Sequence, residues 1–197
     1  MNQHLLVFAR QPELGRVKTR LARTIGDGAA LAVYEELLAH THAVTAELPV
    51  RRLVWLAEEK PGGAAPFWPG YEEHIQSGLD LGARMQAAFA YSFGQGATAA
   101  VIIGTDCPTL SAGHVREAFA ALRTHEVVVG PAADGGYYLL GMQRLQPAFF
   151  QNKTWSTDSV LAELLADARQ LNLRVHQLPV LRDVDTEEDL QAWRAVE

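Results

Sequence analysis

Apolar residues along this chain follow two alternating patterns. Short runs rich in Val, Ile and Leu predict buried strands, and longer stretches with apolar residues three or four positions apart predict amphipathic helices. The short runs predict strands at residues 5–9, 52–57, 72–76, 99–103, 127–129, 137–141 and 173–178. The helical spacing predicts helices at residues 18–25, 27–47, 81–93, 111–123, 159–171 and 186–196. We expect Asp27 to cap the second helix, and Thr186 with Asp189 matches a capping box for the last one.

The order of these elements predicts the fold class. Strands that alternate with helices favour a mostly parallel sheet covered by helices on both faces, which is a three-layer α/β/α architecture. Ligands of such sheets bind at the carboxyl ends of the strands. A chain of 197 residues has the size of one domain, so we expect residues 1–197 to form a single unit, with a loop rich in Gly, Pro and Ala at residues 61–70.

Composition and charge narrow the classes of partner. The net charge of −6 argues against general nucleic-acid binding, which needs a basic surface. No apolar run reaches the roughly 20 residues of a membrane span, and the N-terminal residues lack a signal-peptide pattern. The single cysteine, Cys107, favours a reducing compartment. We therefore expect a soluble, cytoplasmic protein without nucleic-acid or membrane partners.

A basic cluster follows the first predicted strand. In the segment FARQPELGRVKTRLA, Gly15 shapes a turn and basic side chains lie at the start of a helix, where free N–H groups and the helix dipole favour phosphate. Lys18 can act as a point charge, and Arg16 or Arg20 as a fork for phosphate oxygens. The segment is not a Walker-type loop, because Val17 precedes the lysine where glycine is required. The alternative is a solvated basic helix.

Two acidic segments are candidates for a divalent-cation site. Asp106 follows the apolar strand at residues 99–103 in the segment IIGTDCP, and Asp183 and Asp185 alternate in LRDVDTEEDL. Carboxylate and phosphate oxygens are the ligands that Mg²⁺ or Mn²⁺ prefers, and a cation between Asp106 and Asp185 would relieve their repulsion. The alternative is that these aspartates only hydrogen-bond their own turns or cap a helix.

Three further features carry weaker signals. In PAADGGYYLLG, Asp134 precedes Gly135 and Gly136, whose backbone can approach a ligand closely, and the two tyrosines can line an acceptor pocket; a plain turn is the alternative. Trp155 can touch a ligand or pack at a helix start. Cys107 has no marked histidine partner, so a buried structural thiol is favoured over a nucleophile.

Together these segments resemble a bacterial family of the GT-A nucleotide-diphospho-sugar transferase superfamily. Its members are named transferase 1 associated with radical-SAM or selenium domains, or arsenosugar-biosynthesis glycosyltransferase. The resemblance rests on FARQPELGRVKTRLA, LGARM, GTDCPTL, GPAADGGYYLLG, WSTDSVL and DVDTEEDL, which stand in the family's order. More distantly, KTRLA and the single aspartate after the fourth strand are similar to 2-phospho-L-lactate guanylyltransferase and the molybdenum-cofactor guanylyltransferase.

The resemblance implies a GT-A fold, a bound nucleotide or nucleotide-sugar donor, a small acceptor and Mg²⁺ or Mn²⁺. It implies a metal ligand at Asp106 with Asp185, and Asp183 beside it, as the second acidic contact. Phosphate contacts are implied at Arg16, Lys18 and Arg20 and base contacts near Gln76 and Gly82, and we expect further nucleotide or substrate contacts at Ala9, Arg10, Gly15, Gly135, Gly136 and Trp155.

The reaction stays open between two types of transfer. A glycosyltransferase of this fold usually carries an Asp-x-Asp motif, but Gly104 occupies its first position here. A single aspartate with a lysine in the first loop favours transfer of a nucleotidyl group from a nucleoside triphosphate to a small phosphorylated acceptor, with Lys18, Arg16 and Asp106 catalytic. The family names favour glycosyl transfer, in which Asp134 is the best available base. A nucleotide-binding module without catalysis is the third interpretation.

Overall fold

The computed structural model describes residues 2–59 and 67–195. Within them, seven strands form one sheet in the order β3-β2-β1-β4-β6-β5-β7. Every pairing is parallel except those of β6, which is antiparallel to both β4 and β5. The strands are β1 (Gln3–Ala9), β2 (Arg51–Leu56), β3 (Glu72–Ile75), β4 (Ala99–Ile103), β5 (Val127–Pro131), β6 (Tyr137–Met142) and β7 (Val175–Gln177).

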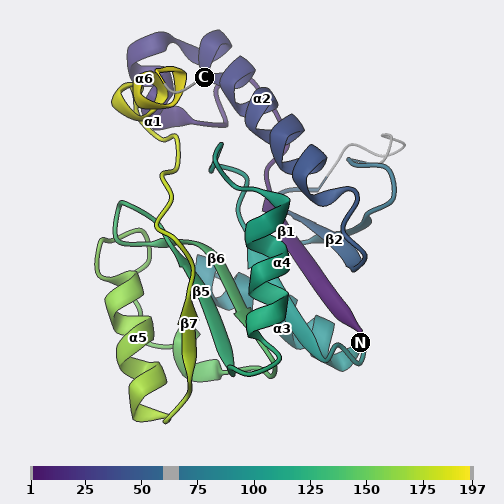
Figure 1. The fold of residues 1–197 in the computed structure, drawn as a ribbon. Helices are drawn as coiled ribbons and strands as arrows, with labels where there is room; N and C mark the ends of the chain where they lie inside the picture. The colour runs from purple at the N-terminus through teal and green to yellow at the C-terminus, as the bar shows by residue number, and fades with distance from the viewer. Residues whose placement is uncertain (1, 60–66, 196–197) are drawn as a thin grey trace.

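Helices cover both faces of this sheet, as Figure 1 shows. The helices are α1 (Thr19–Ile25), α2 (Asp27–Thr45), α3 (Leu81–Gly94), α4 (Ala112–Ala121), α5 (Val160–Gln170) and α6 (Glu187–Arg194), with a 3₁₀ turn at Pro147–Phe150. Successive strand residues point to opposite faces. Leu5 and Val7 therefore join the core under α2 and α4, whereas Leu6 joins the core under α3 and α5.

A third, smaller apolar cluster joins α1, α2 and α6. Leu21, Leu37 and Val184 are buried in it, and Trp193 of α6 packs against them. Figure 1 shows α6 and α1 beside one another, although they come from opposite ends of the chain. This cluster holds the last helix, and the residues that precede it, next to the loop after β1.

The structure confirms the predicted three-layer α/β/α class and the predicted capping box, in which Thr186 and Asp189 satisfy each other's backbone N–H groups. The prediction that Asp27 caps α2 is wrong. Gly26, with a φ of 83°, occupies the cap position, so Asp27 lies in the first turn and its side chain makes no capping hydrogen bond. The predicted loop at residues 61–70 falls largely outside the described residues. In the part of the chain that is described, no helix is long and apolar enough to cross a membrane.

The strand order identifies the edge at which a ligand site belongs. β1 is followed in the chain by β2 on one side of it, whereas β4 lies on its other side and leads on to β6 and β5. The connections after β1 and β4 therefore diverge, and a crevice opens at the carboxyl ends of these two neighbouring strands. Lys18 follows β1 and Asp106 follows β4.

Candidate active site

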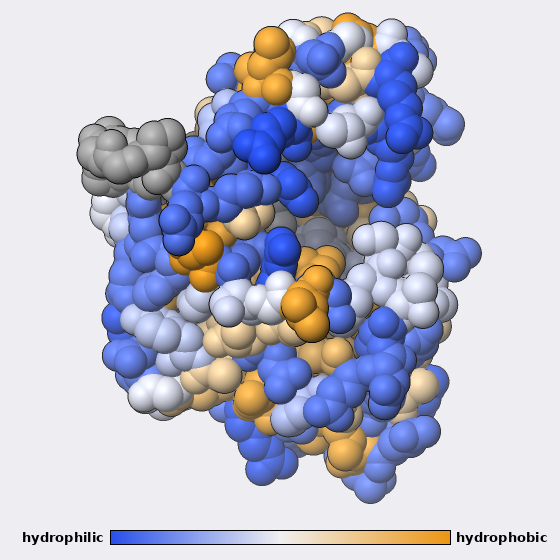
Figure 2. Space-filling model, turned by 180° about the vertical axis from the view of Figure 1, so that it is seen from behind, coloured by the Kyte–Doolittle hydropathy of each residue, from blue (hydrophilic) through white to orange (hydrophobic). Residues whose placement is uncertain are grey.

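A cleft of about 950 Å³ lies at the carboxyl edge of the sheet. It is walled by the loop after β1, the turns after β4 and β5, the start of α3, and the segments around residues 155–160 and 183–185. Figure 2 shows it as a hollow with a largely hydrophilic rim, below the upper part of the molecule that contains α1 and α6.

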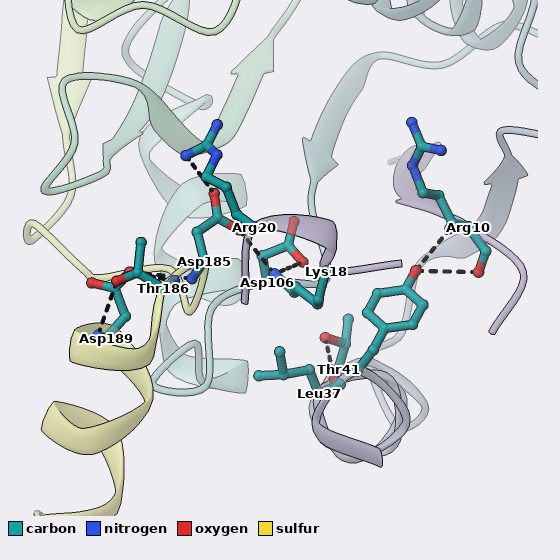
Figure 3. A network of polar contacts seen from close by, with 10 residues as sticks. Arg10, Lys18, Arg20, Leu37, Thr41, Asp106, Asp185, Thr186 and Asp189 are labelled. Carbon is teal, nitrogen blue, oxygen red and sulfur yellow. Dashed lines mark hydrogen bonds and ion pairs between the residues drawn. The ribbon is translucent and has the colours of Figure 1, made fainter. Parts of the chain in front are cut away.

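Lys18 lies at the centre of the acidic side of this cleft. It occupies the cap position of α1 in a left-handed conformation, with a φ of 46°, and its side chain is only 5% exposed. The ammonium contacts Oδ1 of Asp106, and its distance to Oδ1 of Asp185 is 3.1 Å (Figure 3). Burial lowers the pKa of Lys18, but the two carboxylates outweigh burial and leave the pKa above its usual value. The ammonium is therefore charged and shared between two carboxylates.

Backbone hydrogen bonds carry Asp185 to this position from the far edge of the sheet. Leu181 bonds to the end of β5, where its N–H donates to the carbonyl of Pro131 at 3.1 Å. Further along, the Val184 N–H donates to the Asp106 carbonyl at 2.9 Å. The backbone N–H of Asp185 donates to the Asp189 carboxylate of the α6 capping box at 3.2 Å. The segment at residues 181–185 thus runs along the carboxyl ends of the strands and brings Asp185 beside Asp106.

Asp183 faces the same cleft but makes no contact with the Lys18 ammonium that the structure records. Partial burial, followed by the negative charges of Asp106 and Asp134, raises its pKa to about 7. Among the described residues, no three His, Cys, Asp or Glu side chains are gathered closely enough to hold a metal ion. The structure therefore brings Asp106 and Asp185 to one point but does not join Asp183 to them as a third ligand.

The predicted basic residues differ in how they are placed. Arg20 lies 3.6 Å from Oδ2 of Asp185, whereas Arg16 pairs with Glu13 at 2.7 Å and is 66% exposed. Arg10 pairs with Glu58, and its backbone N–H donates to the Tyr34 hydroxyl at 2.8 Å. All three arginines line the cleft, together with Lys18 and the end of β1 at Ala9.

The opposite wall of the cleft is built by close packing around two glycines. A Cβ atom on Gly82 would lie 2.2 Å from the indole of Trp155, so this ring rests directly on the first turn of α3. A Cβ atom on Gly135 would lie 2.2 Å from the carbonyl oxygen of Asp158. Neither glycine lines the cleft. Because neither has a side chain, the segment at residues 155–158 can pack closely against these two backbone positions.

Two other side chains that were predicted to contact a ligand form hydrogen bonds with nearby backbone groups. The Gln76 amide donates to the Trp55 carbonyl at 2.9 Å, and Asp134 accepts a hydrogen bond from the Gly136 N–H at 2.9 Å. Gln76, Asp134 and Gly136 line the cleft, as do Trp155, Asp183 and both tyrosines of β6. Gly15 does not line it; it adopts a φ of 75° in the turn before Lys18. Cys107 is buried, and burial raises its pKa to about 11, which agrees with a structural thiol.

Sequence reasoning missed several residues of the cleft, and two of them, Tyr34 and Arg84, have polar groups that face other parts of the site. Tyr34 lies in α2, within the helix predicted at residues 27–47, and its hydroxyl ties α2 to the loop after β1. Arg84 of α3 stands inside the segment LGARM but carries no signal that separates a buried or paired arginine from a free one. Both are cleft residues because of tertiary packing.

Comparison with known proteins agrees with this architecture. The sequence profile of a bacterial family described as uncharacterized protein conserved in bacteria (DUF2064) matches residues 39–157. A crystal structure from Desulfovibrio desulfuricans G20, described provisionally as a nucleotide-diphospho-sugar transferase, is 31% identical and superimposes with a TM-score of 0.93 over 98% of this chain and 87% of that one. No curated protein matches the sequence.

More distant structures share the fold. A manganese complex of Rv0371c from Mycobacterium tuberculosis H37Rv is 19% identical, with a TM-score of 0.57 over 98% of this chain and 97% of that one. A CMP:2-keto-3-deoxy-manno-octonic acid synthetase complexed with CTP is 14% identical, with a TM-score of 0.57 over 100% of this chain and 98% of that one. These distant likenesses confirm the predicted fold. The predicted enzyme class, a transferase, agrees with the description of the 31% identical Desulfovibrio relative. The narrower subfamily suggested by the sequence stays a prediction.

Proposed function

The chain belongs to the bacterial DUF2064 family, and we propose that its cleft transfers a nucleotidyl group from a nucleoside triphosphate to a small phosphorylated acceptor. The observation that carries the proposal is the cluster in which the Lys18 ammonium lies between Asp106 and Asp185. A buried, charged lysine beside two carboxylates, at the switch point of the sheet, suits a polyphosphate and its counter-cation.

A divalent cation fits the donor set of this cluster. Two carboxylate oxygens already converge on one positive charge, and hard oxygen ligands are those that Mg²⁺ or Mn²⁺ takes. Asp106 and Asp185 are the residues that would hold the ion, and phosphate oxygens would complete its shell. When bound, such an ion neutralises phosphate charge and orients the α-phosphate for attack.

The chain's own residues supply positioning and charge. An acceptor phosphate oxygen forms the new bond to the α-phosphorus, and the bond from the α-phosphorus to its bridging oxygen breaks, so that pyrophosphate leaves with the electron pair. Lys18, Arg16 and Arg20 line the cleft, and in this proposal they meet the negative charge that gathers on the phosphates. Because an acceptor phosphate is already anionic, this reaction needs no general base.

The residue after β4 favours nucleotidyl transfer over glycosyl transfer. Gly104 stands where an Asp-x-Asp motif has its first carboxylate, and a Cβ atom added there meets nothing within 4 Å. Packing therefore does not require glycine at this position, and a site without this carboxylate fits the single-aspartate pattern of nucleotidyl transfer. Glycosyl transfer is the second candidate, because the 31% identical Desulfovibrio protein is described provisionally as a nucleotide-diphospho-sugar transferase. In that reaction Asp134, exposed on the turn before β6, is the residue placed to activate an acceptor hydroxyl.

Product analysis tests the proposal. The protein is incubated with Mg²⁺ or Mn²⁺, each common nucleoside triphosphate or nucleotide-sugar, and a panel of phosphorylated sugars, polyols and hydroxy acids. Release of pyrophosphate with a nucleotidylated product supports nucleotidyl transfer. Release of a nucleoside diphosphate with a glycosylated product would refute nucleotidyl transfer and support glycosyl transfer.

Variants connect the reaction to the cluster. We expect Asp106→Ala to abolish metal-dependent nucleotide binding, and Lys18→Ala to lower turnover about 10²- to 10³-fold, because one preorganised charge-stabilising donor is lost. Lys153→Ala is the matched control, since its ammonium is similarly buried between two acids, Glu163 and Asp167, that do not line the cleft. Near-normal turnover of both cleft variants would remove the proposed mechanism.

A further inference from the structure

Tyr34 lies where α2 passes from one apolar cluster to another. Val33 and Leu37 of this helix are buried in the small cluster with α1 and α6. Tyr34 and Leu38, on the neighbouring face, are buried in the core under α2 and α4. Tyr34 is only 3% exposed, and it forms part of the cleft wall. Packing therefore holds the ring, and the hydroxyl is the part of this side chain that can act on the cleft.

The Tyr34 hydroxyl holds the residue at which the loop after β1 begins. The backbone N–H of Arg10 donates to this hydroxyl at 2.8 Å, and the hydroxyl donates to the Arg10 carbonyl at 3.2 Å. Ala9 is the last residue of β1 that pairs with β2, so a side chain replaces the sheet hydrogen bonds at the next position. Backbone groups removed from water need such partners. Loss of the hydroxyl would therefore release the start of the loop from α2.

The same hydroxyl is close to the turn after β4. Thr105, which precedes Asp106, is 3% exposed, and its side chain is near enough to hydrogen-bond with Tyr34 and lower the pKa of the phenol. Burial raises that pKa and outweighs the hydrogen bonds with Arg10 and Thr105. The phenol therefore stays protonated at neutral pH and can donate one hydrogen bond while accepting others. One side chain thus contacts both segments that supply Lys18 and Asp106 to the cleft.

Lys18 depends on tertiary contacts for its position. It takes the cap position of α1 with a φ of 46°, and no side chain caps this helix with a hydrogen bond. Val17, directly before it, is buried in the same core as Tyr34, and Leu21 in the first turn of α1 is buried in the small cluster. The loop after β1 is therefore fixed at its start by the Tyr34 hydroxyl and at its end by the core that contains Tyr34.

We propose that Tyr34 is a positioning residue. Its hydroxyl aligns the loop after β1 with the turn after β4, so that the Lys18 ammonium and the Asp106 carboxylate stay on one phosphate site. Tyr34 does this from outside the reacting groups, through the backbone of Arg10 and the side chain of Thr105. The effect on turnover rests on the proposed function, whereas the alignment of Lys18 with Asp106 can be measured without a reaction.

Two substitutions remove the hydrogen bonds, and a third is the control. Tyr34→Phe keeps the ring in the core and removes only the hydroxyl. Thr105→Val removes the partner hydroxyl in the turn after β4. Tyr71→Phe is the matched control, because Tyr71 is also buried, its hydroxyl is 2.6 Å from the Thr45 hydroxyl of α2, and it does not line the cleft. Tyr34→Phe and Tyr71→Phe each remove a buried hydroxyl beside α2, so a general loss of stability would affect both.

The side-chain NMR signal of Lys18 reports the alignment. The chain has three lysines, Lys18, Lys60 and Lys153, so protein labelled with ¹³C-lysine gives a simple spectrum, in which the Lys18 signal is identified by its absence in Lys18→Met. Calorimetry measures the affinity for inorganic triphosphate with Mg²⁺, which requires no acceptor and no choice of base. Steady-state kinetics of the transfer reaction separate kcat from KM.

We expect Tyr34→Phe to shift the Lys18 signal, to leave the Lys153 signal in place and to weaken triphosphate binding about 10-fold. In turnover, kcat should fall roughly 10- to 100-fold with a smaller change in KM, because displacing a charge by about 1 Å costs most in the transition state. Thr105→Val should also shift the Lys18 signal. Tyr71→Phe should change none of these quantities.

An unchanged Lys18 signal, or an unchanged triphosphate affinity, in a folded Tyr34→Phe would overturn the positioning role, as would equal changes in Tyr71→Phe. If Tyr34→Phe does not fold, Thr105→Val decides, and an unchanged Lys18 signal in that variant overturns the role. The proposed function fails separately. A shifted Lys18 signal and weaker triphosphate binding in Tyr34→Phe, without group transfer of any kind by the wild-type protein, would refute the reaction alone. Transfer that Tyr34→Phe leaves unaffected would refute the positioning role alone.

Discussion

Replacing Lys18 with methionine removes the ammonium between Asp106 and Asp185 and keeps a side chain of similar length. If the two carboxylates are the cation ligands, the ammonium and a divalent cation compete for the same oxygens. We therefore expect Lys18→Met to bind Mn²⁺ more tightly than the wild-type protein when no nucleotide is present. The same variant should turn over slowly, because it lacks the charge that meets the phosphates.

The contacts give the size of this effect. At about 3 Å and an effective dielectric constant near 20, Coulomb's law gives roughly 5 kcal/mol for each ion pair before solvent screening. The side chains of Asp106 and Asp185 are 44% and 39% exposed, and screening at that exposure reduces each pair to about 1 kcal/mol. The two pairs together are worth about 2 kcal/mol, so Mn²⁺ affinity should rise roughly 10- to 30-fold.

Calorimetry, or the electron paramagnetic resonance signal of free Mn²⁺, measures the two dissociation constants. Lys153→Met removes a similarly buried ammonium from its ion pairs with Glu163 and Asp167 of α5. This control variant should leave Mn²⁺ affinity unchanged. Adding Asp106→Asn to Lys18→Met should reverse the gain. Equal Mn²⁺ affinity in wild type and Lys18→Met, or weaker binding by the variant, would refute the idea that ammonium and metal share one position.

Three other predictions test packing and ionisation. Gly82→Ala should lower the free energy of unfolding, measured in urea, by about 1–3 kcal/mol, since the added Cβ overlaps the Trp155 ring. Gly94→Ala on the same helix is the control, because its Cβ meets nothing within 4 Å and should change stability little. Equal effects of the two substitutions would refute this packing. Partial burial raises the pKa of Glu72, but hydrogen bonds from neighbouring tyrosine, arginine and histidine side chains outweigh it and lower that pKa to about 2. Its stabilisation is complete above the usual pKa near 4.5 and is lost as the pH falls from there toward 2, so the stability of Glu72→Gln in acid titrations should fall less over that window; parallel curves would contradict this. Burial raises the pKa of Cys107 to about 11, so iodoacetamide at pH 8 should modify the native thiol far more slowly than the unfolded one.

Local sequence patterns determined most of the elements. The five consecutive apolar residues of β4 end at Gly104, and the strand runs over Ala99–Ile103 as predicted. The capping box at Thr186 was readable because both partners lie within one turn of helix. The antiparallel direction of β6 was not readable, because a buried strand has the same apolar pattern in either direction. Asp27 misled because glycine at position 26 takes the cap that a polar side chain would otherwise fill.

The sequence by itself determined the kinds of group available: a basic loop after the first strand and two acidic turns far along the chain. It predicted their convergence only by assuming a parallel sheet with ligands at its carboxyl edge. Only the tertiary structure decided that Lys18 and Asp185, 167 positions apart, share a hydrogen bond while Asp183 lies outside it. It alone decided that Arg84 has no carboxylate partner among the described residues, because ion pairing depends on which side chains the fold brings within a few ångströms, and no local pattern encodes that distance.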